Sequence, residues 1–380
     1  MTVRPPPIYL DHNATTPIRP EARAALVAAL DTGGNPSSVH GVGRGARATV
    51  ERCRRRVAGV FDVAADRVTF VSGATEGNAL ALAGAKTVLA GATEHDSVAA
   101  WAHETLPVSA AGTIDIDRLA ARLATMTDPG AVVVSAMAVN NETGVINPIG
   151  EIAALCREAG VRLHCDAAQA VGRLDLAGAV AGADIVTLSG HKFGGPPGIG
   201  VVVVPGGPVP AARMRGGGQE GGRRPGTENL PAIAGFHAGF DAALAAFEAG
   251  DAERLGVLRD RAVSAIRSAV PEAIVAGEGA SGVGNTLCVS MPGVKAETQV
   301  MAFDLEGVAL SAGSACSSGK VRTSPVLLAM GFDADTAGTF IRVSLGWTTT
   351  EADIDRLVDV WRRLHARLAP GENGVVRGAA

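Results

Sequence analysis

The chain has 380 residues, of which 47% are hydrophobic and 19% are charged, and this length and balance predict a globular protein with a sizeable core. Its net charge of −4 and its pI of about 6.1 give no electrostatic reason to expect a nucleic acid or an anionic membrane as a partner. The apolar stretches have the length of strands or carry charges, and no charged-then-apolar leader precedes Tyr9, so we expect neither a membrane span nor a signal peptide.

Strand-like and helix-like segments alternate through the first two-thirds of the chain. The expected strands are 67–71, 87–89, 131–136, 161–165, 183–188 and 201–204. The expected helices begin near Gly73 and His95, and two more span 148–158 and 231–249. Asn147 before the helix at 148–158 and Gly160 after it are suitable start and stop signals. This alternation predicts an α/β fold with a mostly parallel sheet that helices cover on both faces.

From about Leu255 the order of elements changes. The elements expected there are a helix, a strand at 286–290, a helix near Glu297, a strand at 309–310 and a helix at 351–368. This order is typical of a smaller α+β domain. We therefore expect a large α/β domain at 15–250 and a small domain made of 1–14 and 251–380, with the N-terminal segment packed against it.

The five cysteines are odd in number, scattered, and without a C-x-x-C pair; they are Cys53, Cys156, Cys165, Cys288 and Cys316. This pattern argues against a disulfide framework and against a structural zinc site. It fits a reducing compartment, so we expect a cytoplasmic protein.

Lys192 is one of only four lysines, beside Lys86, Lys295 and Lys320. It lies between the expected strands at 183–188 and 201–204, in a connection rich in glycine and proline. A lysine in this place is not an ordinary solvated surface lysine, because α/β enzymes bind their ligands where such strands end. Lys192 is therefore a candidate Schiff-base lysine.

Asp166 follows the preceding expected strand, and one short crossover helix fits between it and Lys192. Both side chains can therefore emerge at the same edge of the sheet. An aspartate alone at a strand end is a simple cap about as often as it is a functional residue. Together the pair suits pyridoxal phosphate, because the carboxylate keeps the pyridine nitrogen protonated and the lysine forms the imine.

The phosphate of such a cofactor needs amide donors at the start of a helix. The segment 72–75, between a strand and a helix, supplies amides at Ala74 and Thr75 and a hydroxyl, although many strand–helix turns look the same. Ser189 and His191 are two further candidate donors. His95 also follows a strand; a histidine there is more often a helix cap, and the alternative is that it stacks on the pyridine ring.

At this point the chain resembles the group I cysteine desulfurases, the NifS/IscS-like branch of the class V, fold type I pyridoxal-phosphate enzymes. The resemblance covers nearly the whole length. The motifs that carry it are 9–16, 34–38, 72–78, 94–95, 140–144, 164–169, 189–192, 216–220, 226–227, 311–319 and 341–344. Each motif alone is weak, but all of them in this order are highly specific.

The resemblance implies that Lys192 bears the cofactor, that Asp166 pairs with its ring nitrogen and Gln169 with its phenolic oxygen, and that His95 stacks on the ring. The residues implied in cofactor binding beyond these four are Ala74, Thr75, Asn141, Ser189, Gly190, His191 and Thr227. Thr227 would reach the phosphate bound by the partner subunit, which implies a homodimer with shared active sites.

The resemblance also implies that Arg342 binds the substrate carboxylate in a two-pronged contact, with Asn141 beside it. Two positions depart from the pattern, since Gly221 and Pro225 stand where many relatives carry Arg and Ser. This departure could alter a loop near the subunit interface or the contacts with a partner.

Cys316 lies in a small, polar stretch at 311–320, whereas the other four cysteines lie in helical or apolar contexts where core packing is the simpler role. The resemblance assigns to Cys316 the thiolate that takes sulfur from L-cysteine, leaves L-alanine, and passes the sulfur to an iron–sulfur scaffold or another acceptor. His95 would move protons on the substrate thiol, and nearby Lys320 would favour the thiolate weakly. No intrinsic metal site is expected, although Cys316 could contact an iron–sulfur cluster on a partner.

Three alternatives stay open at this stage. A selenocysteine lyase would use the same chemistry. A class V aminotransferase would not need a cysteine such as Cys316. A degenerate relative that acts only as a binding or regulatory partner would be expected to lack Lys192, Asp166 or Cys316, and all three residues are present.

Overall fold

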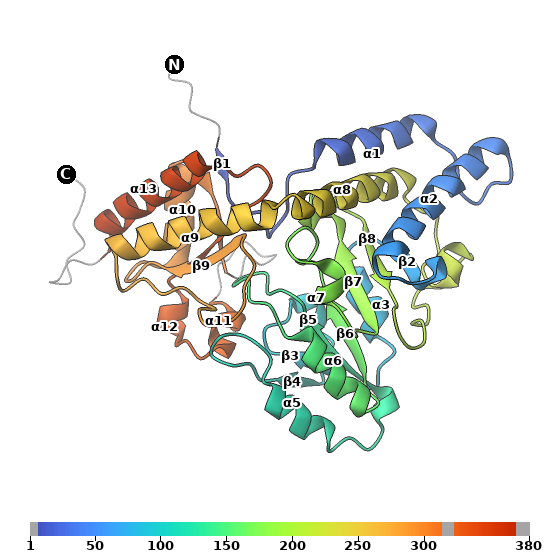
Figure 1. Cartoon of the computed structure of the whole chain (residues 1–380), viewed down its shortest axis with the longest axis horizontal. Helices are drawn as coiled ribbons and strands as arrows, with labels where there is room; N and C mark the ends of the chain where they lie inside the picture. Colours follow the sequence, from blue (N-terminus) through green and yellow to red (C-terminus); the bar gives the residue numbers. More distant parts are fainter. Residues whose placement is uncertain (1–6, 314–322, 370–380) are drawn as a thin grey trace.

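The computed structural model describes residues 7–313 and 323–369, and two lobes lie side by side in it (Figure 1). The larger lobe is built around one sheet whose strands are β2 Val68–Val71, β8 Gly200–Val203, β7 Ile185–Ser189, β6 Arg162–Asp166, β5 Val132–Met137, β3 Thr87–Gly91 and β4 Glu104–Leu106, in this spatial order. The pairs from β7 to β4 are parallel, and β8 runs antiparallel to both β2 and β7. The predicted mostly parallel α/β fold is therefore confirmed. The connection from β7 to β8 is too short for a helical crossover, which explains the one reversed strand.

Helices cover both faces of this sheet. They are α1 Pro20–Thr32, α2 Gly41–Val60, α3 Ala74–Leu82, α4 Asp96–Ala99, α5 Ile116–Leu123, α6 Ile149–Glu158, α7 Leu176–Ala179 and α8 Leu230–Glu248, with short 3-10 turns η1 Ala65–Arg67, η2 Pro129–Ala131, η3 Gly190–Lys192 and η4 Gln219–Gly222. α3 packs on one face, in a core shared with Val71 and Val202. α2, α6 and α8 enclose the larger core on the other face, which includes Phe236 and Phe240.

α1 and α2 were not expected from the sequence. α2 is rich in arginine and glycine, which hides its apolar stripe, yet Ala46, Val50, Cys53 and Val57 recur at helical spacing and are buried. α1 packs along α8, and α8 also contacts α2. Among the described helices, α8 alone is long and apolar enough to cross a membrane by length and composition, but half of it is buried between its neighbours, as in a core helix.

Asn147 was wrongly interpreted as the start signal of α6. The helix begins at Ile149, and Pro148 occupies the position before it without a side-chain cap. The Asn147 side chain instead accepts a hydrogen bond from the backbone of Ile114 at 2.9 Å and donates one to the backbone oxygen of Met137 at 2.9 Å. Asn147 therefore ties the end of β5 to the segment before α5.

The smaller lobe contains α9 Asp251–Ala269, β9 Thr286–Ser290, α10 Ala296–Leu305, β10 Val308–Ala309, β11 Ser311–Ala312, α11 Pro325–Ala329, α12 Ala334–Ala337, β12 Phe340–Ser344 and α13 Glu351–Leu368. β11, β12 and β9 form an antiparallel sheet, packed on a separate core that includes Phe303 and Trp361. The strand expected at 309–310 is in fact two short strands on either side of Leu310.

The N-terminal segment connects the two lobes. β1, Ile8–Tyr9, pairs in parallel with β10, and Asp11 forms a bridge with Ser344 of β12. The backbone nitrogen of Thr16 then donates to the backbone oxygen of His191 at 2.8 Å, within the turn η3 that carries Lys192. A segment that is remote in sequence is therefore fixed against the end of β7.

The close contact between β8 and the start of α3 gives a stability prediction. A Cβ atom on Gly200 would lie 2.5 Å from the backbone oxygen of Leu188 and 2.9 Å from Cα of Gly73. We expect Gly200→Ala to destabilise the fold by about 1–3 kcal/mol, because backbone atoms cannot yield as a flexible side chain does. The measurement is the midpoint of thermal unfolding.

Gly45→Ala is the matched control, since Gly45 lies inside α2 with nothing within 4 Å of its Cβ position. Alanine there should leave stability unchanged or raise it by up to about 1 kcal/mol. Equal midpoints for the two variants would contradict the close packing described for Gly200.

Candidate active site

A cavity of about 520 Å³ opens where β5, β6 and β7 end, and residues of both lobes line it. The polar residues of its lining are Asn13, Ser72, Thr75, Glu76, Glu94, His95, Asp96, Ser97, Asn141, Glu142, Asp166, Gln169, Ser189, His191, Lys192 and Arg342. Its size lies within the usual range for small-molecule sites. The carboxyl edge of a parallel sheet is also where α/β proteins bind ligands.

Lys192 lies at the end of the turn η3 that follows β7. Its Nζ donates to the backbone oxygens of Asn13 at 2.8 Å and Ala14 at 3.0 Å. Burial, followed by the positive charges of Arg342 and Arg173, lowers the pKa of Lys192 to about 8. A large share of the amine is therefore neutral near pH 8, which a nucleophilic or basic lysine requires.

Asp166 ends β6 and lies in register with Thr187 of β7, so the structure brings Asp166 and Lys192 to the same edge of the sheet. Its two carboxyl oxygens accept hydrogen bonds from Nδ2 of Asn78 at 2.7 Å and from the backbone nitrogen of Ala168 at 2.9 Å. No cation pairs with this carboxylate in ranges 7–313 and 323–369. The carboxylate is thus fixed in orientation and can accept a further N–H from a ligand.

The start of α3 lines the opposite part of the cavity. Gly73, at the position before the helix, provides no side-chain cap for the first amides, and Ala74 and Thr75 face the cavity. Ser189 and His191 line the same part of the wall. Free amides at a helix start beside hydroxyl groups make a suitable environment for a phosphate.

Not every residue of the 189–192 motif reaches the cavity. Gly190 is buried, and a Cβ on it would lie 3.0 Å from the side chain of Ile199 and 3.1 Å from that of Phe236. Gly190 packs against these two side chains and is not among the residues that line the cavity. His191 contacts Oγ1 of Thr15 through Nδ1 at 3.2 Å, and burial beside Lys192 lowers its pKa to about 4, so its ring is neutral.

His95 caps a helix and also lies in the cavity wall. Its Nδ1 accepts from the backbone nitrogen of Ser97 at 3.1 Å, so the ring caps α4. The same ring lines the cavity. Because the cap uses Nδ1, the ring is held in one orientation with Nε2 on its other side.

Gln169 faces the cavity and is held on two sides. Its Nε2 donates to the backbone oxygen of Asn13 at 3.0 Å, and its Oε1 accepts from Arg173. Arg173 had not been predicted to have a role. Its place four residues after Gln169, across a turn, gives no recognisable signal in the sequence.

Arg342 enters the cavity from β12 of the smaller lobe. It donates to Oδ1 of Asp11 at 2.7 Å and to the backbone oxygen of Asn141 at 3.2 Å, while its buried Nε has no partner. Asn141 also lines the cavity, so the two residues predicted to bind the substrate, Arg342 and Asn141, lie in the same cavity. Asp11 was not predicted, although it lies in the 9–16 motif.

Glu94 is a third residue that the sequence reasoning missed, next to the predicted His95. Its Oε1 accepts from the backbone nitrogen of Met137, and its buried Oε2 has no partner. Burial, followed by the negative charge of Asp166, raises the pKa of Glu94 to about 8. Glu94 is therefore a mainly protonated carboxyl in the cavity wall at neutral pH.

Other predicted residues lie away from this cavity or outside the described ranges. Thr227 is exposed and does not line the cavity of its own chain. Cys316 and Lys320 lie outside the described residues. Gly221 adopts a left-handed conformation with φ 64°, which favours glycine, directly after Glu220 with φ 52°.

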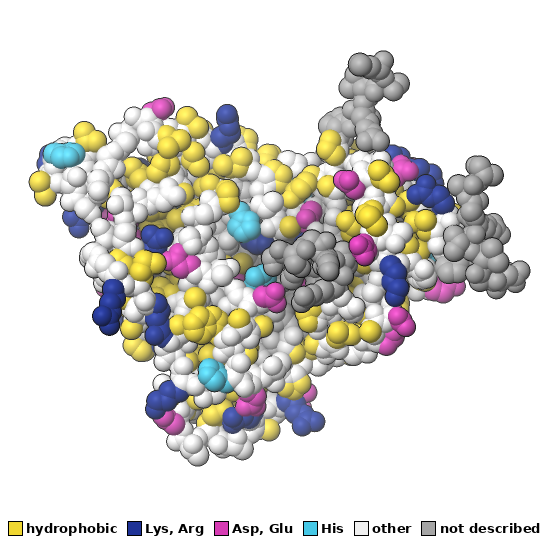
Figure 2. All heavy atoms as spheres, turned by 180° about the vertical axis from the view of Figure 1, so that it is seen from behind, with side chains coloured by type: hydrophobic (Ala, Val, Ile, Leu, Met, Phe, Trp, Pro, Cys, Tyr) yellow, Lys and Arg dark blue, Asp and Glu magenta, His cyan; other side chains and the backbone are white. Residues whose placement is uncertain are grey.

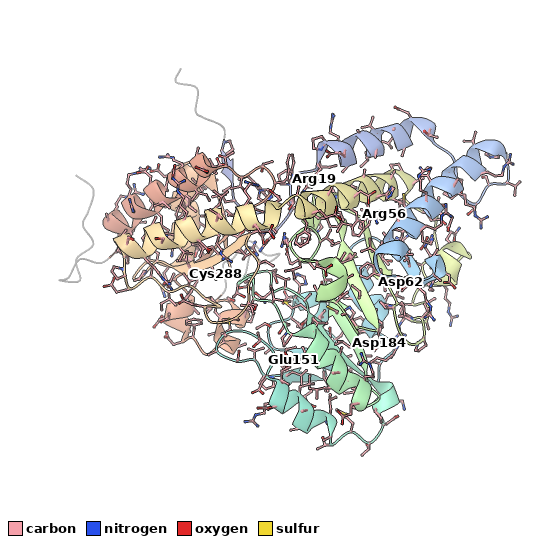
Figure 3. The ribbon with its side chains drawn as sticks, in the orientation of Figure 1. Arg19, Arg56, Asp62, Glu151, Asp184 and Cys288 are labelled. Atoms are coloured by element: carbon pink, nitrogen blue, oxygen red, sulfur yellow. The ribbon has the colours of Figure 1, made fainter. Side chains whose placement is uncertain are left out.

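The remaining cysteines are poor nucleophiles. Cys53, Cys156, Cys165 and Cys288 are free and buried, and Cys288 lies on β9 in the smaller lobe (Figure 3). Burial raises the pKa of all four thiols, to about 11 for Cys53 and about 12 for Cys156. Within the described ranges, no group of three or more His, Cys, Asp or Glu could hold a metal ion.

Residues 8–357 match the family described as aminotransferase class-V. The chain belongs to this family. It is 36% identical to a cysteine desulfurase of Cereibacter sphaeroides, over 93% of this chain and 94% of that protein. It is 35% identical to an IscS-like cysteine desulfurase of Mycobacterium tuberculosis, with the same coverage of 93% and 94%. The structure of a NifS-like protein from Rickettsia africae is similar with a TM-score of 0.84 and 30% identity, over 95% of this chain and 99% of that chain.

Membership of the class-V family makes this chain a pyridoxal-phosphate-dependent enzyme, and the cavity of this class-V protein fits that cofactor. The uncapped start of α3 offers amides to a phosphate. The carboxylate of Asp166 lacks a cationic partner among the described residues and can accept a ring N–H. Lys192 supplies an amine with a lowered pKa in the same cavity.

The protonated state of Glu94 gives a pH-dependent prediction for this class-V enzyme. The unfolded chain releases this proton above about pH 4.5, whereas the folded chain holds it to about pH 8, so the folded state loses stability as the pH rises between these values. Glu94→Gln keeps an oxygen acceptor for Met137 and cannot ionise. We expect the variant to gain up to about 3 kcal/mol relative to the wild type between pH 5 and pH 8.

Thermal unfolding midpoints at a series of pH values measure this difference. Glu158→Gln, at an exposed glutamate at the end of α6, is the control, and its difference from the wild type should stay flat. A difference for Glu94→Gln that is independent of pH would show that Glu94 is ionised in the fold.

Proposed function

We propose that this chain is a cysteine desulfurase, which converts L-cysteine to L-alanine and transfers the sulfur to Cys316. The observation that carries the proposal is the convergence of Lys192, Asp166 and Arg342 in one cavity. The relatives described above support the choice of substrate through their names. When bound, pyridoxal phosphate withdraws electrons from the Cα atom of an amino acid.

Arg342 binds the substrate carboxylate in this proposal. Asp11 and the backbone of Asn141 already orient its guanidinium, and Nε remains without a partner. A substrate carboxylate would supply that missing acceptor. Because the guanidinium is buried, a hydrogen bond to it is stronger than the same contact in water.

Lys192 takes the proton from Cα of the bound amino acid. The carbonyls of Asn13 and Ala14 hold its amine at the edge of the cavity, and its lowered pKa keeps a share of it neutral near pH 8. Asp166 would keep the ring nitrogen of the cofactor protonated, and Gln169 would donate to its phenolic oxygen. The phosphate would be held through amides and side-chain donors by Ala74, Thr75, Ser189 and His191.

Sulfur transfer uses Cys316. Its thiolate attacks Sγ of the substrate, an S–S bond forms, and the Cβ–Sγ bond breaks with its electron pair passing to Cβ, which gains a proton. The products are alanine and a persulfide on Cys316, so the step needs no external oxidant or reductant. His95 moves the proton of the substrate thiol through Nε2, since its Nδ1 caps α4.

We also propose that two chains form a homodimer in the cytoplasm, with Thr227 reaching the phosphate in the partner subunit. An apolar hollow of about 530 Å³, lined by Leu80 of α3 and by Trp101 and Met214, supports a protein contact on this side of α3. The acceptor of the sulfur would be an iron–sulfur scaffold or another protein. On the face shown in Figure 2, acidic and basic side chains are interspersed, which fits the expectation that nucleic acid is not a partner.

The test of the proposed function is incubation with L-cysteine, followed by detection of alanine and mass analysis of the peptide that contains Cys316. We expect alanine and added sulfur on that peptide. Formation of a keto acid without added sulfur would favour an aminotransferase. Faster alanine release from selenocysteine than from cysteine would favour a selenocysteine lyase.

Two variants separate the roles of Lys192 and Cys316. Lys192→Ala should lose turnover. Borohydride reduction should attach the cofactor covalently to the wild-type chain but not to this variant. Cys316→Ser should keep the bound cofactor and its absorbance but form no persulfide. Full activity of the first variant, or normal sulfide release by the second, would place the chemistry on other residues.

Arg342→Lys tests the substrate carboxylate contact. Lysine keeps the charge but not the planar fork, so we expect a loss of about 10- to 100-fold in kcat/KM for L-cysteine. Most of the loss should appear in KM. An unchanged KM would mean that another group binds the carboxylate.

A further inference from the structure

Arg173 is a cation directly behind the active-site cavity. The residue as a whole is half-buried, but its guanidinium is enclosed by the protein, and burial together with Arg342 lowers its pKa to about 9. One of its nitrogens donates to Oε1 of Gln169, and another donates to the backbone oxygen of Lys192 at 3.3 Å. No carboxylate pairs with it in the described part of the chain. A buried charge without a paired carboxylate is costly, so the presence of Arg173 here calls for an explanation.

The contact with Arg173 fixes which way the amide of Gln169 points. Arg173 can only donate, so it requires the oxygen of the amide on its side. The backbone oxygen of Asn13 can only accept, so it requires the nitrogen. A reversed amide would place two donors together on one side and two acceptors on the other. Gln169 therefore offers its second Nε2 hydrogen, and not its oxygen, to the cavity.

We propose that Arg173 is a positioning residue that acts through Gln169: it holds an N–H donor toward the cavity and thereby selects an anionic acceptor there, the phenolic oxygen of the cofactor. This inference rests on the cofactor of the proposed function and deepens it. It assigns a role to a residue that does not touch the cavity itself.

Arg173 also acts on the turn that carries Lys192. The backbone oxygen of Lys192 accepts from both Arg173 and Oγ1 of Thr16, the latter at 3.1 Å, which fixes the end of η3. The charged groups that face the Lys192 amine are Arg342, Arg173, Asp166 and Asp11. Replacing Arg173 removes only one of these four charges. A shift in the pKa of the Lys192 amine in such a variant therefore reports on the charge of Arg173.

A double-mutant cycle on the full-length chain tests the proposal without any substrate. The dissociation constant of pyridoxal phosphate is measured for the wild type, Arg173→Met, Gln169→Ala and the double variant. We expect each single change to weaken binding by about 10-fold, because each removes one charge-assisted or oriented hydrogen bond. The double variant should bind no more weakly than Gln169→Ala.

A second readout is the pH dependence of Lys192 acylation in the protein freed of cofactor. We expect Arg173→Met to raise the midpoint by about one pH unit, because a neighbouring positive charge is lost. Arg173→Lys keeps that charge and serves if the methionine variant does not fold. It should hold the midpoint at the wild-type value and retain part of the cofactor affinity.

Arg259→Met is the matched control. Arg259 also donates to a backbone oxygen, that of Val283 at 2.8 Å, but lies outside the cavity. It should change neither readout. Additive losses in the cycle, or an equal loss in the control, would overturn the proposal. The cycle could also give the expected result while the wild-type chain releases no alanine from cysteine. That outcome would contradict the proposed function but not the role of Arg173.

Discussion

The arrangement of the site depends on hydrogen bonds to the backbone oxygen of Asn13. It accepts from the amine of Lys192 and from the amide of Gln169, which come from two different strand ends. The Asn13 side chain meanwhile donates to the backbone of Asn141 in the larger lobe and to Oγ1 of Thr286 in the smaller lobe. One residue near the start of the chain thus connects the larger lobe, the smaller lobe and the reactive amine, and the N-terminal segment supplies Asn13 and Ala14 to the cavity wall.

Burial and neighbouring charges change the ionisation of two groups in the cavity. Burial and two arginines lower the pKa of the Lys192 amine, and burial beside Asp166 raises the pKa of Glu94. Asp166 itself receives two hydrogen bonds from its own lobe. Since buried ionic groups are costly unless paired, this set of partly compensated charges favours the binding of a ligand that carries both a cation and anions.

The sequence was informative for several residues that directly follow a strand. Lys192, Asp166 and the start of α3 could be placed together because parallel strands end at one edge of a sheet. It was uninformative for Arg173, whose contacts depend on a turn, and for the helix α2, whose arginines obscure its apolar stripe. The prediction for Asn147 was wrong because an asparagine side chain can cap a helix or form hydrogen bonds to the backbone elsewhere. Only the tertiary contacts decide between the two.

The burial of the other four cysteines limits where sulfur can reside. A persulfide exchanges with a second thiol only if that thiol can ionise and be approached, and neither condition holds for Cys53, Cys156, Cys165 or Cys288. In the proposed reaction, sulfur carried by Cys316 therefore does not pass to these four buried thiols. A bound acceptor then has no competitor for that sulfur among the cysteines of the described residues.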